Sequence, residues 1–236
     1  MKHKLTPGTY EFMIARTAFF DHIVAEALHD NVAQVVFLGA GYDSRAYRFR
    51  DLIRDTSIFE LDTRPTQQRK KQLLQQAGIP LPEQLTFVPI NFDEDDLKDT
   101  LIKAGFTPRR RTVYIWEGVT YYLSAEVIDG TLRFIRENSP ARSSLSFDYA
   151  SLSRQALNDG SVKRLREHMS SEHPAEPTKF GIPEGELKGF LAQRGYEIAE
   201  HLTPGEMERK YLVRRDGSSA GKVPPLFCLV HASLTG

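Results

Sequence analysis

The sequence is poor in cysteine, in long apolar runs and in net charge. A single cysteine, Cys228, among 236 residues excludes an internal disulfide and leaves no cysteine cluster for zinc. It lies in the apolar run 226–230, where we expect a buried thiol rather than a nucleophile. No run of about 18 apolar residues occurs, so we expect no membrane-spanning helix.

Charges of the two signs balance. Lys plus Arg and Asp plus Glu number 31 each, which argues against nucleic acid or an anionic membrane surface as a partner. No spacing of His, Cys, Asp or Glu suggests a metal site. The amino terminus shows no apolar signal core, so a cytoplasmic protein is the expectation.

The chain is organised around the stretch 34–48. Four apolar residues, 35–38, predict a central parallel strand that is buried on both faces. The turn Gly39-Ala40-Gly41 allows a sharp change of direction and lets a ligand approach the main chain. A helix to about residue 54 should follow, which makes a nucleotide-binding βα opening. Alone the turn is a weak signal, because a plain tight βα turn has the same pattern.

Strands and helices alternate as far as residue 149, which predicts a parallel sheet with helices on both faces. The two last strands, expected at 196–202 and 226–234, should close the sheet with an antiparallel edge. The other strands are expected at 35–38, 57–61, 85–90, 112–116 and 143–149, and the first helix at 10–28. The fold class is therefore α/β, a doubly wound sheet with its last strand antiparallel.

No internal repeat or linker divides the chain, so we expect a single domain over 1–236. Its first 30 residues should form an amino-terminal helix or cap. The segment 150–185 is expected to be a lid or substrate insertion, because 170–183 is rich in Pro, Glu and His.

Polar side chains follow the carboxyl ends of successive expected strands. Asp62 ends the second strand, where a carboxylate can accept two hydrogen bonds from a ribose. Glu60 has the same parity on that strand, and either acid could instead cap the next helix. Asn91 follows the third strand and Glu117 the fourth. These side chains face one crevice in a doubly wound sheet, which suits a nucleoside-bearing cofactor.

The glycine turn lacks the third glycine of a dinucleotide-binding fingerprint. Residues 39–44 read G-x-G-x-x-S, and Tyr42 and Asp43 crowd the position where a pyrophosphate would lie. A nicotinamide-dependent oxidoreductase stays an alternative on the strength of the turn and Asp62.

Three motifs carry a family resemblance: L-G-A-G-Y-D-S-R-A-Y-R at 38–48, F-E-L-D-T-R-P at 59–65 and W-E-G-V-T-Y-Y-L at 116–123. They resemble the leucine carboxyl methyltransferase type of class I S-adenosylmethionine-dependent methyltransferases, which includes bacterial O-methyltransferases of secondary metabolism. The resemblance covers residues 7 to about 211. It implies a Rossmann-like, seven-stranded sheet and S-adenosyl-L-methionine as the cofactor.

The resemblance also implies roles for single residues. Arg16 matches the arginine that grips the methionine carboxylate, a task suited to a guanidinium fork. Glu117 matches the acid near the methionine ammonium, and Asp62 the ribose-binding acid. The remaining matched cofactor-binding positions are Gly39, Ala40, Gly41, Asn91 and Phe92. Arg45 is expected to form a structural ion pair rather than to act in catalysis.

The resemblance leaves the acceptor open. A hydroxyl or carboxylate of a small molecule, such as a polyketide or peptide of secondary metabolism, fits it, and so does a protein carboxylate. A hydroxyl acceptor would be helped by a base, for which His173, His201 and Asp148 are candidates, although a structural role is preferred for each. Tyr121 and Tyr122 could line the acceptor pocket or simply pack.

Only six residues precede the Pro7-Gly8 break, whereas relatives often carry a longer amino-terminal cap. The acceptor pocket is therefore expected to be open, or closed by 170–183 or by a partner subunit. A homodimer and a non-catalytic partner subunit are both compatible with the sequence.

Overall fold

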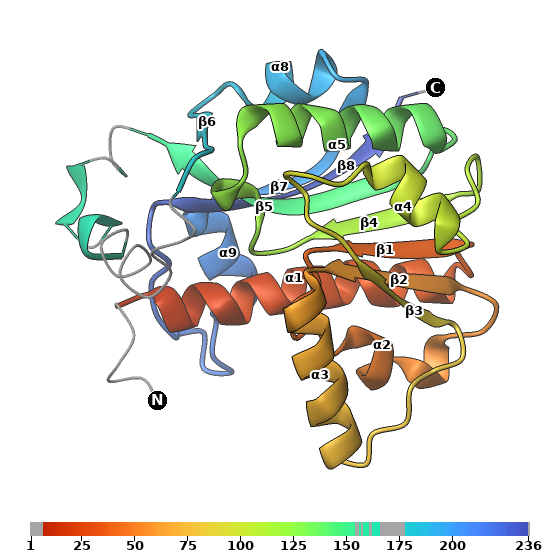
Figure 1. The fold of residues 1–236 in the computed structure, drawn as a ribbon. Helices are drawn as coiled ribbons and strands as arrows, with labels where there is room; N and C mark the ends of the chain where they lie inside the picture. Colours follow the sequence, from red (N-terminus) through yellow and green to blue (C-terminus); the bar gives the residue numbers. More distant parts are fainter. Residues whose placement is uncertain (1–6, 154–155, 157, 161, 166–177, 236) are drawn as a thin grey trace.

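The computed structural model describes residues 7–153, 156, 158–160, 162–165 and 178–235. There a central sheet carries helices on both faces (Figure 1). The main path of the sheet has the order β3-β2-β1-β4-β5-β8-β7. Its strands are β1 Gln34–Leu38, β2 Ser57–Asp62, β3 Leu85–Pro89, β4 Thr112–Trp116, β5 Ser144–Leu152, β7 Tyr196–Leu202 and β8 Phe227–Leu234. The predicted doubly wound, mostly parallel sheet is confirmed.

β1 occupies the centre because it is apolar along its whole length. All five of its residues are buried, and it pairs in parallel with β2 on one side and β4 on the other. The chain runs outward from β1 to β3 and then returns to place β4 beside β1. This reversal is the switch point where open α/β sheets bind their ligands, at the carboxyl ends of the strands.

β8 is the antiparallel strand, as predicted, but it does not lie at the edge. It runs antiparallel to β5 and to β7 and separates them, so that β7 forms the edge. The expected antiparallel edge is confirmed, because the edge pair β7 and β8 is antiparallel, and the structure adds that the last strand is inserted between two others. A short extra strand, β6 Ile182–Pro183, pairs with the end of β5 outside the main path.

Alternate residues of β1 enter two different cores. Val35 and Phe37 pack with α1 and α9 on one face, and Val36 and Leu38 pack with α4 and α5 on the other. The helices are α1 Thr9–His29, α2 Arg45–Arg48, α3 Arg64–Gln76, α4 Leu97–Lys103, α5 Ala125–Asn138, α8 Leu187–Ala192 and α9 Pro204–Tyr211. The buried aromatic stripe of α1 supports the half of the sheet that contains β1 and β4 (Figure 1).

Two helices are shorter than their sequences predict. The helix after the glycine turn ends at Arg48, and a 3₁₀ turn, η2 Arg50–Leu52, replaces the rest, because Phe49 turns its partly buried ring toward the first core. The acids at 93–96 predict a helix that begins near residue 93, but α4 begins at Leu97. Asp96 caps it by accepting from the backbone of Asp99 at 2.7 Å, and 91–95 form a separate turn.

The expected lid at 150–185 is described only in part. Residues 1–6 and 166–177, the latter including His173, lie outside the described residues. None of the helices that the structure describes combines the length and apolarity needed to cross a bilayer.

Candidate functional site

A cavity of about 790 Å³ opens at the carboxyl ends of β1 and β4. This volume lies within the range of small-molecule and cofactor pockets, about 300–1,000 Å³. Its walls come from α1, the glycine turn and the segment after β4, and they include Arg16, Gly39, Ala40, Gly41, Glu117 and Tyr121. The switch point, the glycine turn and two of the predicted polar residues therefore meet at one place.

Gly39 allows the turn to pass close to the segment after β4. Its φ of +72° belongs to the left-handed region, and a Cβ there would lie 2.5 Å from Cγ2 of Val119. A side chain is thus excluded on two grounds, conformation and space. Gly41 has a φ of +47°, and no neighbouring atom lies within 4 Å of the position that its Cβ would take. Its turn leaves open space beside the backbone.

Asp62 holds the glycine turn from the neighbouring strand. Its Oδ2 accepts from the backbone N–H of Gly41 at 2.6 Å, and its Oδ1 accepts from Thr63 at 2.7 Å. Glu60, the other acid on β2, lies elsewhere, because it is buried and its Oε2 is 2.6 Å from Nζ of Lys70. Burial raises the pKa of Glu60 to about 7, although Lys70 opposes the shift. Of the two acids, Asp62 is therefore the one joined to the turn.

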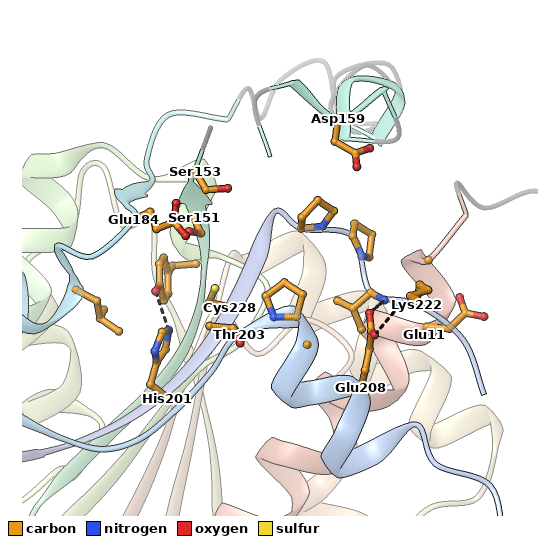
Figure 2. A pocket seen from close by; sticks show the side chains of 18 of the residues that line it. Glu11, Ser151, Ser153, Asp159, Glu184, His201, Thr203, Glu208, Lys222 and Cys228 are labelled. Atoms are coloured by element: carbon orange, nitrogen blue, oxygen red, sulfur yellow. Dashed lines mark hydrogen bonds and ion pairs between the residues drawn. The ribbon is translucent and has the colours of Figure 1, made fainter. Parts of the chain in front are cut away.

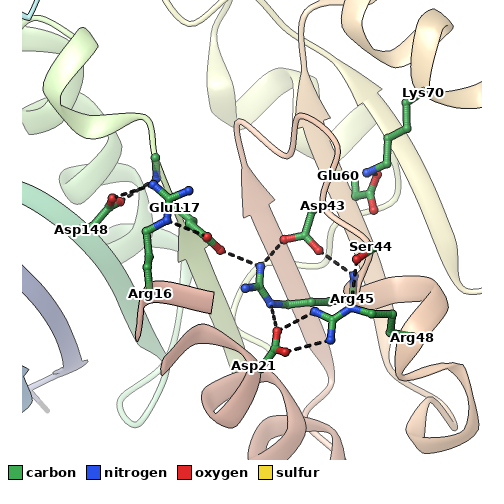
Figure 3. A network of polar contacts seen from close by, with 11 residues as sticks. Arg16, Asp21, Asp43, Ser44, Arg45, Arg48, Glu60, Lys70, Glu117 and Asp148 are labelled. Carbon is green, nitrogen blue, oxygen red and sulfur yellow. Dashed lines mark hydrogen bonds and ion pairs between the residues drawn. The ribbon is translucent and has the colours of Figure 1, made fainter. Parts of the chain in front are cut away.

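Alternating charges run along the polar wall of the cavity (Figure 3). Glu117 lies between two arginines, with Oε1 2.9 Å from Nε of Arg16 and Oε2 2.7 Å from Nη1 of Arg45. Arg45 also contacts Asp43 in the turn and, at 2.7 Å, Asp21 of α1. Arg45 thus forms the structural ion pair that its sequence position predicts, but Asp21 was not predicted as one of its partners. Asp21 follows the aromatic residues of α1 as a single acid, and such a pattern is equally typical of a helix face exposed to solvent.

Arg16 joins Glu117 to a second acid, Asp148 of β5. Its Nη1 lies 3.3 Å from Oδ2 of Asp148, and Oδ1 of Asp148 accepts from the backbone of Gly118 at 2.6 Å. Burial acts to lower the pKa of Arg16, but the charge of Asp148 and its other neighbours raise it above the usual range. Asp148 has no exposed surface and does not line the cavity. Its position fits a structural tie and does not fit the base for which it was a candidate.

The opposite wall of the cavity is aromatic. The ring centroid of Phe227 lies 4.7 Å from Phe12 and 5.2 Å from Tyr121, and Tyr121 packs edge-on against Tyr122 at 4.7 Å. Tyr121 and Tyr122 thus line the cavity and pack at the same time. Burial raises the pKa of Tyr121 well above its usual value, so its hydroxyl is neutral at physiological pH.

Asn91 and Phe92 do not line this cavity. Oδ1 of Asn91 accepts from the backbone of Asp93 at 3.2 Å, and its own N–H donates to Asp95 at 2.8 Å. Phe92 packs, partly buried, against the second core. Their expected place beside an adenine stays a prediction.

A second cavity, of about 1,120 Å³, lies beyond β5, near the amino-terminal end of α9 (Figure 2). His201 lines it, with Nε2 2.9 Å from the hydroxyl of Tyr149, and burial lowers the pKa of His201 below 6.5. The glycine turn, Arg16 and Glu117 are absent from its walls. Although larger, it therefore lacks the polar set that sequence analysis tied to a cofactor, and His201 is separated from that set.

Comparisons with known proteins agree with this geometry. The model of a family described as leucine carboxyl methyltransferase matches residues 1–136. YktD of Bacillus subtilis (strain 168), provisionally named an S-adenosyl-L-methionine-dependent methyltransferase, is 31% identical over 210 residues, which cover 88% of this chain and 68% of YktD. This chain spans 63% to 68% of the length of four such curated relatives.

Solved structures share the fold at low identity. A DUF574 family protein from Streptomyces avermitilis has a TM-score of 0.65 at 16% identity, over 93% of this chain and 82% of that one. Magnesium protoporphyrin IX methyltransferase from Synechocystis PCC 6803, with bound S-adenosylhomocysteine (SAH), has a TM-score of 0.58 at 12% identity, over 96% and 86%. At these identities the likeness extends to the fold alone.

Proposed function

This chain belongs to the leucine carboxyl methyltransferase family, and from that premise we propose that it methylates an oxygen atom, of a hydroxyl or a carboxylate, on a small molecule. Its cofactor is S-adenosyl-L-methionine. Bound at the site, this cofactor supplies a methyl group on a sulfonium. Held by Arg16 and Glu117, it would pass that methyl group to an acceptor oxygen, and the electron pair of the S–CH₃ bond would stay on sulfur. The donor is already activated, so the protein contributes mainly positioning and exclusion of water.

The cavity fits such a cofactor in three respects. Gly41 leaves open space where a side chain would block an approaching ribose. Oγ1 of Thr9, a residue of the cavity wall, is buried and has no hydrogen-bond partner among the described residues, so a polar ligand that reaches it would satisfy it. Arg16 offers a guanidinium to a carboxylate, and Glu117 offers carboxylate oxygens to an ammonium.

The observation that carries the proposal is the charge balance of the polar wall. Its network contains the arginines 16, 45 and 48 and four acids, namely Asp21, Asp43, Glu117 and Asp148. The surplus negative charge suits a ligand that brings a sulfonium and an ammonium together with one carboxylate. A nicotinamide dinucleotide brings negatively charged phosphates instead, which this wall would repel. Together with the missing third glycine and the family membership, this argues against the oxidoreductase alternative.

The apolar wall is where we place the acceptor. Phe12, Tyr121, Tyr122 and Phe227 form an aromatic surface, which favours an acceptor with an apolar or aromatic body. Among the described residues that line the cavity there is no histidine, and both acids, Asp43 and Glu117, are paired with Arg45. This supports an acceptor oxygen that ionises without a protein base, as a carboxylate does.

Two measurements test the proposal. Calorimetry with SAH should show binding to the isolated protein, and absence of binding would overturn the assignment of the cofactor. Mass spectrometry with methyl-labelled donor and a panel of aromatic carboxylic acids, phenols and peptides should show methyl ester or ether formation. Transfer by the isolated chain would also exclude a purely non-catalytic subunit.

A further inference from the structure

Arg45 is a buried arginine that the proposed chemistry does not use directly. It is the first residue of α2, immediately beyond the glycine turn, and only 4% of it is exposed. Its guanidinium contacts three carboxylates from three segments: Asp21 of α1, Asp43 of the turn and Glu117 at the end of β4 (Figure 3). Burial acts to lower the pKa of Arg45, but these three acids raise it, so the group stays charged.

The contact with Glu117 fixes one side of a carboxylate that faces the cavity. Nη1 of Arg45 lies 2.7 Å from Oε2, while Arg16 takes Oε1 from the other side. A carboxylate offers about four lone-pair sites, so two charged contacts leave it able to accept from a ligand. A free glutamate side chain would lose rotamer entropy on binding, and the two arginines remove that cost in advance.

We propose that Arg45 is a positioning residue for the amino-acid end of the cofactor. It holds the Glu117 carboxylate in the direction from which the α-ammonium is received, without touching the ligand itself. The inference rests on the proposed function. It goes further in making one arginine, outside the expected binding set, control recognition of the ammonium.

The geometry requires an arginine and not merely a positive charge. Nε is directed at Asp21 while Nη1 is directed at Asp43 and Glu117, and this fork is fixed by the planar guanidinium. A lysine carries the charge on a single nitrogen and cannot hold all three acids in these directions. Arg45→Lys therefore retains the positive charge but no longer holds the Glu117 carboxylate in its orientation.

Arg48 provides a matched control on the same helix. Its Nη1 and Nη2 bind Asp21 at 2.8 and 2.7 Å, and it has no contact with Glu117 among those that the structure describes. Arg48→Lys thus disturbs the same acid of α1 and leaves the Glu117 pair in place.

The experiment measures binding of three ligands by calorimetry. SAH carries the ammonium and the carboxylate, its decarboxylated analogue keeps the ammonium, and 5′-methylthioadenosine lacks both. We expect Arg45→Lys to weaken the first two about 10- to 100-fold, the range of one charge-assisted hydrogen bond, and the third less than about twofold. Arg48→Lys should change all three by one common factor.

The double variant with Glu117→Gln assigns the effect to its cause. Adding Arg45→Lys to Glu117→Gln should produce little further loss, because both remove the same interaction. The proposal would be overturned if Arg45→Lys weakened the binding of all three ligands equally or weakened only that of SAH. It would also be overturned if the losses of affinity in the double variant were additive. If Arg45→Lys fails to fold, Glu117→Asp is measured instead, because it keeps the charge but shifts the carboxylate. Unchanged ratios of the affinities for the three ligands, relative to the wild-type protein, would then overturn the proposal. If the wild-type protein binds none of the three, the proposed function itself has failed.

Discussion

The two halves of the carboxyl edge of the sheet organise their polar groups differently. Around β1, β2 and β4, charged side chains from distant segments meet at one cavity of about 790 Å³. Around β5, β8 and β7 the cavity is larger, about 1,120 Å³, but the arginines and acids of that network are absent from its lining, and His201 there pairs with the hydroxyl of Tyr149. The family match, residues 1–136, ends before the second half begins. Convergence of charges from separate segments, and not the size of the hollow, therefore locates the candidate chemistry.

Removal of Arg16 should have the largest effect on the first half. Arg16→Ala removes the arginine that pairs with the buried Asp148 and one of the two arginines that pair with Glu117, and breaking a buried ion pair costs about 3–5 kcal/mol. Thermal unfolding should show this loss, and binding of SAH should disappear. Arg16→Lys should fold better but still bind more weakly, because a lysine lacks the fork; unchanged affinity would refute the bidentate argument.

Alanine substitutions at the two glycines of the turn should differ in how much they lower the stability of the protein, which is the second largest effect that we expect. Gly39→Ala adds left-handed strain of roughly 1–2 kcal/mol to a clash with Val119, for which overpacking costs about 1–3 kcal/mol more. Gly41→Ala meets no neighbour, so strain alone should lower its stability. Chemical denaturation of both variants measures the difference, and equal losses would show that the approach of Val119 is not tight.

Replacement of Asp62 should mainly lower the affinity for the cofactor, whereas replacement of Asp43 should mainly lower the stability of the fold. Asp62→Ala removes two hydrogen bonds to the backbone of the turn and, with them, the carboxylate that we expect to bind the ribose. We expect it to weaken cofactor binding more than Asp43→Ala does. Asp43→Ala should instead lower the midpoint of unfolding more, because the buried Arg45 loses a partner. The same order in both measurements would mean that the ribose acid is misassigned.

The smallest effect that we expect is a pH dependence of stability, caused by the partly buried histidines of the second half. Burial lowers the pKa of His201 and His231 below 6.5 in the folded chain, so the unfolded chain binds more protons as the pH falls below 6.5. The free energy of unfolding should therefore decrease as the pH falls below 6.5 and not depend on these groups above it. His231→Gln should flatten that slope in denaturation series between pH 5 and 8, and an unchanged slope would show that His231 is not responsible for it.

Several parts of the fold could be predicted because local signals bounded them sharply. The strands Thr112–Trp116 and Tyr196–Leu202 begin and end where the sequence predicts. Helix α5 starts after Ser124, which accepts from the backbone of Val127 at 3.3 Å as a cap. That Asp62 lies beside the glycine turn follows from the rule that parallel strands end at one edge, although its hydrogen bond to the backbone of Gly41 was not predicted.

What could not be predicted depends on contacts between distant segments. A basic residue after a glycine turn gives no hint that Arg45 would hold three acids, because each of those acids also suits a solvated surface. The contact of the Asn91 side-chain oxygen with the backbone of its own turn was likewise not predicted, while its place beside an adenine stays a prediction. Likewise, alternation of strands indicates that a strand exists and not where it is inserted.

The position of β8 has a consequence for how the molecule is assembled. In the described residues β7 is joined to the sheet only through β8, whose residues, Phe227–Leu234, come some 25 positions later in the chain. The strands β1 to β5 pair with one another without β8, whereas β7 has no neighbour in the described sheet until β8 is in place. Attachment of β7 to the sheet therefore depends on a segment that follows it in the chain and that must pair with β5 as well.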